Sequence, residues 1–249
     1  MHWIVQDNVF REDRYSQVIE TLERGEIPHT VVTVVPFTHE IVPLPRASNP
    51  IAVIGSYLLV KRAHELGWGP GVFSDDIPFP LCAEVFGRDL LNHGARVCAL
   101  GEVALRETRF IRPIADGKTF PGTVVHPDEL ASWRQSLCEG SRRVSAETQV
   151  VVAPPKEIHA EYRFFVVDGR IVTASRYKLG GRMNPDAEVA PEAEAAARRF
   201  VGRWEPDRAF VIDVALTPDG AKVVEINNIN AAGWYHADVS RVIQAIDAL

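Results

Sequence analysis

The chain reads Phe210-Val211-Ile212-Asp213 and then, beyond a Pro-Asp-Gly turn, Val223-Val224-Glu225-Ile226-Asn227. Two apolar, largely β-branched runs around such a turn predict a β-hairpin. In that hairpin Asp213 and Glu225 stand roughly opposite each other. Asn227 lies on the same face as Glu225, because side chains alternate along a strand. Three oxygen-bearing side chains are therefore expected to converge.

Carboxylate and amide oxygens are hard ligands of the kind that Mg²⁺ prefers, and Mg²⁺ normally completes its shell with water and substrate phosphates. A nucleotide is therefore implied together with the metal. The alternative is that Asp213 and Glu225 are solvated carboxylates on an exposed sheet face. Their apolar neighbours favour burial, and like charges within a sheet need a compensating cation.

These two runs resemble the metal-binding strands at the C-terminal end of ATP-grasp enzymes, and the resemblance extends over about residues 85–249. It implies an ATP-grasp fold of the α+β class, in which two α+β subdomains clasp the nucleotide. It also implies that Asp213, Glu225 and Asn227 bind one or two Mg²⁺ ions against the phosphates of ATP. Upstream, residues 161–169 are similar to the family strand whose arginine faces the γ-phosphate or acyl phosphate, which implies a catalytic role for Arg163.

One departure from the family pattern concerns the lysine that most ATP-grasp enzymes place on a strand of the first subdomain. Here the matching strand reads Phe110-Ile111-Arg112-Pro113, and Lys118 follows it. This arrangement resembles a divergent ATP-grasp clade with an arginine-and-lysine signature, as does the stretch 227–235. The resemblance implies that Arg112 and Lys118 contact the phosphates of ATP.

The same resemblance implies that the adenine ring is held by the backbone of a linker between the subdomains. The best candidate is the run Gln149, Val150, Val151 and Val152, which can also be an ordinary buried strand. Arg176 and Lys178 follow the expected strand at 171–175. We assign Arg176 a catalytic role and Lys178 a role in nucleotide binding, with simple solvation as the alternative for both.

The order of elements predicts three parts. Residues 1–80 alternate short strands with amphipathic helices and predict an α/β lobe, bounded by a Gly- and Pro-rich stretch after residue 67. Residues 81–153 are the first ATP-grasp subdomain and 154–249 the second, with the metal site. Within these parts we expect a helix at 82–91, a helix capped by Asp128 and a polar lid at 178–189.

Composition excludes several classes of protein. The 249 residues are 46% apolar and 24% charged, without an apolar run near the ~20 residues that span a bilayer. No signal peptide is recognisable, so we expect a cytoplasmic protein without membrane contact. The formal net charge of −6 argues against nucleic-acid binding. A local basic cluster could still bind a polyphosphate; its members would be Arg106, Arg109, Arg112 and Lys118.

From these residues and the resemblance we expect a carboxylate–amine ligase that uses ATP and Mg²⁺ and forms an acyl-phosphate intermediate. Its substrates would be a small-molecule or peptide carboxylate and an amine, and a protein acceptor also fits. Two alternatives remain open. The chain could be an ATP-binding assembly or adaptor protein for a protein partner, or a kinase that transfers phosphate and stops.

Overall fold

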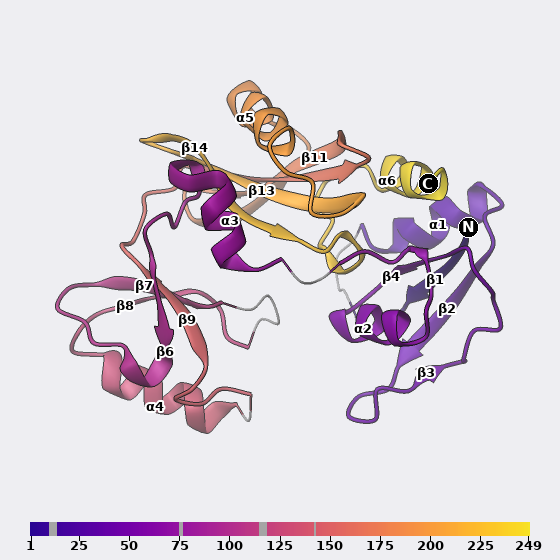
Figure 1. Ribbon diagram of the computed structural model, residues 1–249. Coiled ribbons are helices and arrows are strands. Elements are labelled where there is room, and N and C mark those ends of the chain that lie inside the picture. The colour runs from indigo at the N-terminus through magenta and orange to yellow at the C-terminus, as the bar shows by residue number, and fades with distance from the viewer. Residues whose placement is uncertain (10–13, 75–76, 115–118, 142) are drawn as a thin grey trace. The chain divides into compact units, whose positions relative to one another are not determined.

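The computed structural model describes residues 1–9, 14–74, 77–114, 119–141 and 143–249 (Figure 1). The chain divides into two compact units. Unit 1 comprises Met1–Asp76 and Ile158–Leu249, and unit 2 comprises Ile77–Glu157. Unit 1 holds two separate five-stranded sheets, one from each of its two segments. The three-part division with boundaries near residues 80 and 153 stays a prediction.

The first sheet of unit 1 has the strand order β3-β2-β1-β4-β5, and its central strands are parallel. Parallel strands joined through helices form an α/β lobe, which confirms the expectation for this part of the chain. The elements are β1 (His2–Gln6), α1 (Ser16–Arg24), β2 (His29–Val34), β3 (Ile41–Val42), β4 (Ile51–Ile54), α2 (Tyr57–Glu65) and β5 (Pro70–Gly71).

The second sheet of unit 1 is antiparallel, with the order β12-β11-β10-β13-β14. The predicted hairpin of β13 and β14 is confirmed, and β10 and β11 form another hairpin across Asp168 and Gly169. Asp168 and Gly169 both have positive φ, 44° and 69°, as a two-residue hairpin turn requires. The elements are β10 (Ala160–Val167), β11 (Arg170–Leu179), β12 (Arg182–Asp186), α5 (Pro191–Val201), β13 (Ala209–Thr217), β14 (Gly220–Asn227) and α6 (Val239–Asp247).

The stretch 178–189 differs from the expected polar lid loop. Strand β11 continues to Leu179, the chain turns at Gly180 and Gly181, and β12 returns beside it. Both glycines have positive φ, 56° and 76°, which residues with a Cβ adopt only at a cost. Gly180 and Gly181, which in the sequence indicate a loop, therefore form the turn of the hairpin β11–β12.

The two sheets of unit 1 share one apolar core. Trp3 and Val5 of β1 belong to the same buried cluster as Phe165 and Val211 of the second sheet. Phe165 stacks on Trp234 with 5.2 Å between ring centroids. Helices α1 and α6 lie side by side over this core (Figure 1).

Unit 2 is built on a four-stranded antiparallel sheet with the order β6-β9-β7-β8. Its core joins Ile111 and Val150 of the sheet to Leu130 and Trp133 of α4. The elements are α3 (Phe79–Phe86), the 3₁₀ turn Gly87–Asp89, β6 (Arg96–Ala99), the 3₁₀ turn Leu100–Glu102, β7 (Arg109–Pro113), β8 (Thr123–Val125), α4 (Leu130–Gly140) and β9 (Gln149–Ala153).

Two expectations in unit 2 are corrected. The helix expected at 82–91 spans 79–86 instead. It ends before residue 91 because Gly87 takes φ 51° and closes α3. Asp128 does not cap α4: the residue at the N-cap is Glu129, which makes no side-chain cap hydrogen bond. Among the described helices of both units, none is long and apolar enough to cross a membrane.

Candidate functional site

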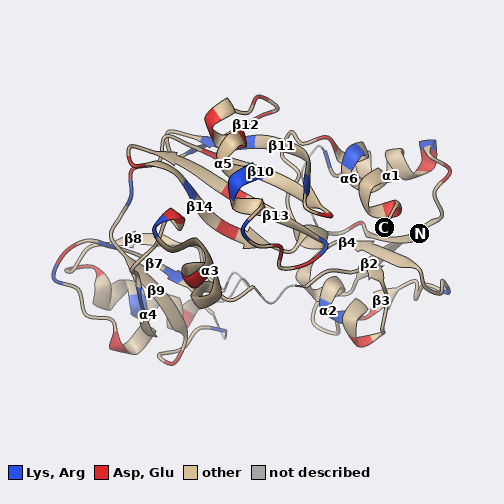
Figure 2. Cartoon of the chain, turned by 45° about the horizontal axis from the view of Figure 1, so that its top comes forward, with Lys and Arg blue, Asp and Glu red and all other residues tan. Residues whose placement is uncertain are grey.

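Two of the three predicted metal-binding residues, Asp213 and Glu225, lie in one row across the second sheet of unit 1, and Asn227 lies two positions further along β14, opposite Val211. Backbone pairing sets Arg163 of β10 beside Asp213 of β13, and Asp213 beside Glu225 of β14. Residues paired in this way point to the same face of a sheet. Figure 2 shows acidic and basic segments mixed among these strands. The sequence argument that Asp213 and Glu225 are neighbours is therefore confirmed.

Asp213 is held by Arg163 in a two-point ion pair. Arg163 Nε donates to Oδ1 and Nη2 to Oδ2, each at 2.8 Å, while Nη1 donates to the Gly233 carbonyl at 3.3 Å. Both side chains are buried, with relative exposures of 5% for Arg163 and 1% for Asp213. One positive charge beside the buried Asp213 is thus supplied by the protein itself.

The electrostatics of this pair follow from its burial. Burial raises the pKa of Asp213 and the charge of Arg163 opposes this effect, while repulsion from Glu225 and Glu161 adds to it. Burial also works against the charged form of Arg163, but the Asp213 carboxylate beside it raises the pKa of Arg163 well above its usual value. Arg163 is therefore a fixed positive charge.

Two stacked tyrosines cover Arg163. The rings of Tyr177 and Tyr235 lie 5.0 Å apart, and the guanidinium of Arg163 lies 5.8 Å and 5.3 Å from their centroids. Tyr177 donates its hydroxyl hydrogen to Glu161 Oε2 at 2.6 Å, and Lys178 Nζ donates to Glu161 Oε1 at 3.0 Å. Burial, with the nearby carboxylates, raises the pKa of Tyr177 well above its usual value.

Sequence reasoning missed Glu161, Tyr177 and Tyr235. Strand alternation could have found Glu161, which shares a face with Arg163 two residues along β10. Tyr177 could not be placed, because a register shift between Glu161 and Tyr162 alters the alternation on β11.

The donor set fits a hard divalent cation. Asn227 Nδ2 donates to Glu225 Oε1 at 2.9 Å, and within the described residues Glu225 Oε2 and Asn227 Oδ1 make no hydrogen bond. The described residues contain no group of three or more His, Cys, Asp or Glu side chains placed to hold a metal. Two carboxylates and one amide form an incomplete shell, as expected for Mg²⁺ that shares its coordination with phosphate and water.

Arg176 is not brought together with Arg163. It pairs with Tyr162, one residue before Arg163, so alternation places its side chain on the opposite face of the sheet. There its Nη2 donates to Asn184 Oδ1 at 2.7 Å and to Asp186 Oδ2 at 3.1 Å. These bonds hold β12 against β11, and a catalytic role for Arg176 stays a prediction.

Arg112 and Lys118 are the residues of unit 2 that were predicted to contact the phosphates of ATP. Arg112 lies on β7, with its guanidinium 5.3 Å from the centroid of the Phe79 ring. Lys118 lies outside the described residues. Arg109 and Arg112 point to opposite faces of β7, because three positions separate them. The basic cluster expected from their closeness in sequence is therefore split.

The run Gln149 to Val152 forms β9, a central strand. It pairs with β6 on one side and β7 on the other, so the backbone groups of Val150 to Val152 are committed to the sheet. An adenine ring cannot use those groups without breaking the ladder. The carbonyl of Gln149 likewise accepts from the Ile114 amide, at 3.0 Å. The prediction that this run binds adenine therefore rests on its side chains, among which that of Gln149 belongs to an exposed residue.

Two asparagines that follow β14 have a structural role. Asn228 Nδ2 donates to the Phe73 carbonyl at 2.6 Å, and Asn230 Nδ2 donates to the carbonyls of Val53 and Gly71 at 2.7 and 2.9 Å. Both side chains are buried. They join the end of β14 to the first sheet of unit 1.

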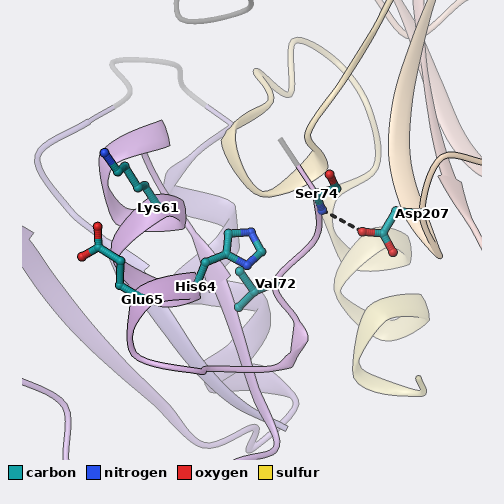
Figure 3. A pocket seen from close by; sticks show the side chains of 6 residues that line it. All are labelled: Lys61, His64, Glu65, Val72, Ser74 and Asp207. Carbon is teal, nitrogen blue, oxygen red and sulfur yellow. Dashed lines mark hydrogen bonds between the residues drawn. The ribbon is translucent and has the colours of Figure 1, made fainter. Parts of the chain in front are cut away.

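A separate cavity of about 440 Å³ in unit 1 contains none of the predicted residues. The Ser74 amide donates to Asp207 Oδ2 at 2.7 Å (Figure 3). His64 Nε2 lies 3.1 Å from the carbonyl oxygen of Phe73. The cavity is lined by Lys61, His64, Glu65, Val72, Ser74 and Asp207.

The fold has well-defined structural relatives. D-cycloserine synthetase DcsG superposes with a TM-score of 0.67 at 14% identity, covering 99% of this chain and 98% of that chain. A D-alanine–D-alanine ligase from Bacillus anthracis gives 0.65 at 10% identity, covering 100% and 96%. A RimK domain protein from Sphaerobacter thermophilus DSM 20745 gives 0.64 at 16% identity, covering 99% of each chain.

No curated protein is significantly similar in sequence. The family model for the ATP-grasp domain of the R-two-K clade, family 3, matches residues 52–246, which include every residue of the row across the second sheet. The expected fold and the resemblance to an arginine-and-lysine clade are thereby confirmed. The chain belongs to the ATP-grasp superfamily, in family 3 of the R-two-K clade.

Proposed function

We propose that the chain is an ADP-forming carboxylate–amine ligase that uses ATP and Mg²⁺. The observation that carries this proposal is the row Arg163, Asp213 and Glu225, completed by Asn227 on the same strand as Glu225. This row offers a fixed positive charge next to oxygen ligands. A phosphoryl group needs both kinds of group around it during transfer.

In the proposed reaction, a substrate carboxylate attacks the γ-phosphate of ATP, releasing ADP and forming an acyl phosphate. An amine then attacks the acyl carbon and phosphate leaves, which forms the amide bond. Asp213, Glu225 and Asn227 would hold Mg²⁺, which when bound neutralises phosphate charge. Arg163 would face the transferred phosphoryl group, and Arg112 and Lys118 of unit 2 would contact the phosphates.

The rest of the site keeps Arg163 in place. The two-point bond to Asp213 and the stacked rings of Tyr177 and Tyr235 restrict the rotamers of Arg163. A charge that is already oriented needs little reorganisation during reaction, so positioning contributes more to the rate than a general base. The hairpin β11–β12, with exposed Leu179 and Met183 near its turn, would help to exclude water from the acyl phosphate.

An ADP-release screen tests the proposal. Pairs of amino acids, small acids, amines and short peptides are supplied with Mg²⁺ and ATP, and products are identified by mass spectrometry. A ligase releases ADP only when both substrates are present and yields an amide, and Glu225→Gln should lower the rate at least about 100-fold.

The alternatives give different results in the same screen. A kinase releases ADP without an amine and leaves a stable phosphorylated product. An adaptor protein binds nucleotide and releases no ADP with any pair. Equal rates for wild type, Asp213→Asn and Glu225→Gln would contradict the proposed site.

A further inference from the structure

A second pocket of about 440 Å³ lies at one end of the sheet of unit 2. Arg96 begins β6, Arg109 begins β7, and Val152 lies near the end of β9 between them. The segment before β7 adds Arg106 and Glu107. Four charged side chains, one from β6 and three from residues 106–109, thus line one small cavity.

The strand register separates this pocket from the residues proposed to contact ATP. Arg96, Val152 and Ile111 are paired in one row across β6, β9 and β7. Arg109 precedes Ile111 by two positions and shares its face. Arg112 points to the other face of β7, so the two faces of this sheet carry separate positive charges.

The charge of the pocket is only partly compensated. Glu107 forms an ion pair with Arg109, whose Nη1 also donates to the Thr108 carbonyl at 3.4 Å. Within the described part of the chain, Arg96 and Arg106 make no side-chain hydrogen bond and no ion pair. Two guanidinium groups are therefore available in a chain whose net charge is −6.

Size and lining indicate the kind of ligand. Sites for small molecules typically enclose about 300–1,000 Å³, and this pocket falls in that range. Val152, Leu105 and Pro154 supply apolar surface beside the arginines. Guanidinium groups bind phosphate oxygens in pairs, and several of them together favour a dianion over a single carboxylate.

We propose that this pocket binds the phosphate group of a small molecule, with Arg96 and Arg106 as the main ligands and Arg109 as a third. The site is distinct from the nucleotide site and does not depend on the ligase proposal. Pro154, which lines the pocket, directly follows β9 and lies in the segment that leads from unit 2 into unit 1.

Isothermal titration with pyrophosphate tests the proposal, on the full chain with Mg²⁺ and excess AMP-PNP to fill the nucleotide site. Wild type should bind one pyrophosphate. Arg96→Gln combined with Arg106→Gln should weaken this binding at least about tenfold, because two charge-assisted hydrogen-bonding groups are lost. Arg112→Gln should leave it unchanged.

Two further variants sharpen the result. Arg170→Gln with Arg182→Gln removes the same charge from exposed positions of unit 1 and should bind like wild type. Glu107→Gln removes the carboxylate that competes for Arg109 and should tighten binding. Wild type that binds no pyrophosphate, a loss caused by Arg112→Gln instead, or weaker binding by Glu107→Gln would overturn the proposal.

Discussion

At the scale of single residues, the buried pair of Arg163 and Asp213 is the least expected feature of the site. Asp213, Glu225 and Asn227 could be placed from sequence, because a hairpin turn and strand alternation determine which of them are neighbours. The partner of Asp213 could not, because 50 residues separate it from Arg163 and strand order is not encoded locally. The positive charge that the sequence led us to expect from a bound metal ion is supplied in part by the side chain of Arg163.

Removing one partner of this pair should be costly. Arg163→Met leaves Asp213 buried without its cation, and we expect a loss of about 3–5 kcal/mol in the free energy of unfolding, measured by urea denaturation. Arg163→Met combined with Asp213→Leu should lose less than Arg163→Met alone, since no charge is then stranded. A loss below about 1 kcal/mol for the single variant would contradict the structural role of the pair.

At the scale of elements, hairpins were more predictable than the segments around them. The Asp168-Gly169 turn carries its own conformational signal, and both strands beside it were found. The strands β6 and β12 were missed, because β6 is short and lies at a sheet edge, and β12 contains Pro185. The run at β9 was placed correctly as a strand, but only tertiary pairing shows that its backbone is committed on both sides.

Helix α6 provides a prediction at this scale. Burial works against ionisation of its N-cap residue Asp238, but hydrogen bonds from the Ser240 hydroxyl and the amides of Ser240 and Arg241 outweigh it and lower the pKa of Asp238. A lowered pKa stabilises the fold above the pKa of the unfolded state. That stabilisation is lost as the pH falls through the folded-state value.

Asp238→Ala should therefore cost about 0.5–1 kcal/mol at pH 7, because the carboxylate is half exposed. The difference from wild type should shrink below about pH 4 in urea unfolding curves, as both states of wild type become protonated. Asp238→Asn keeps a cap and should lose less at pH 7. If the loss of unfolding free energy caused by Asp238→Ala grew as the pH fell, the stabilisation that we assign to the ionised Asp238 carboxylate would be contradicted.

At the scale of the whole molecule, the two sheets of unit 1 are joined by residues that follow β14. Sequence predicted both sheets, but it could not show that Asn228 and Asn230 connect them. Their partners are backbone groups up to 177 positions away, and backbone groups carry no sequence signal. Within the stretch 227–235, which resembles the clade in sequence, Asn228 and Asn230 hold the two sheets of the unit together.

Asn230 should be the more sensitive of the two. Its side chain donates to Val53 and Gly71 and accepts from the Phe73 amide at 2.9 Å. Asn230→Ala leaves those three backbone groups without their partner and should lower the free energy of unfolding by about 2–4 kcal/mol. Gln244→Ala, at an exposed site on α6, is the control. Equal unfolding midpoints for both variants would contradict this role.

The central claim is that Asp213, Glu225 and Asn227 bind a divalent ion together with a nucleotide. Mn²⁺ in place of Mg²⁺ reports this directly, because its electron paramagnetic resonance signal distinguishes free from bound ion. In the presence of AMP-PNP, wild type should bind Mn²⁺ at least about tenfold more tightly than Glu225→Gln or Asn227→Ala, with the exposed-carboxylate variant Glu188→Gln like wild type. Equal Mn²⁺ affinities in all four proteins would contradict the claim.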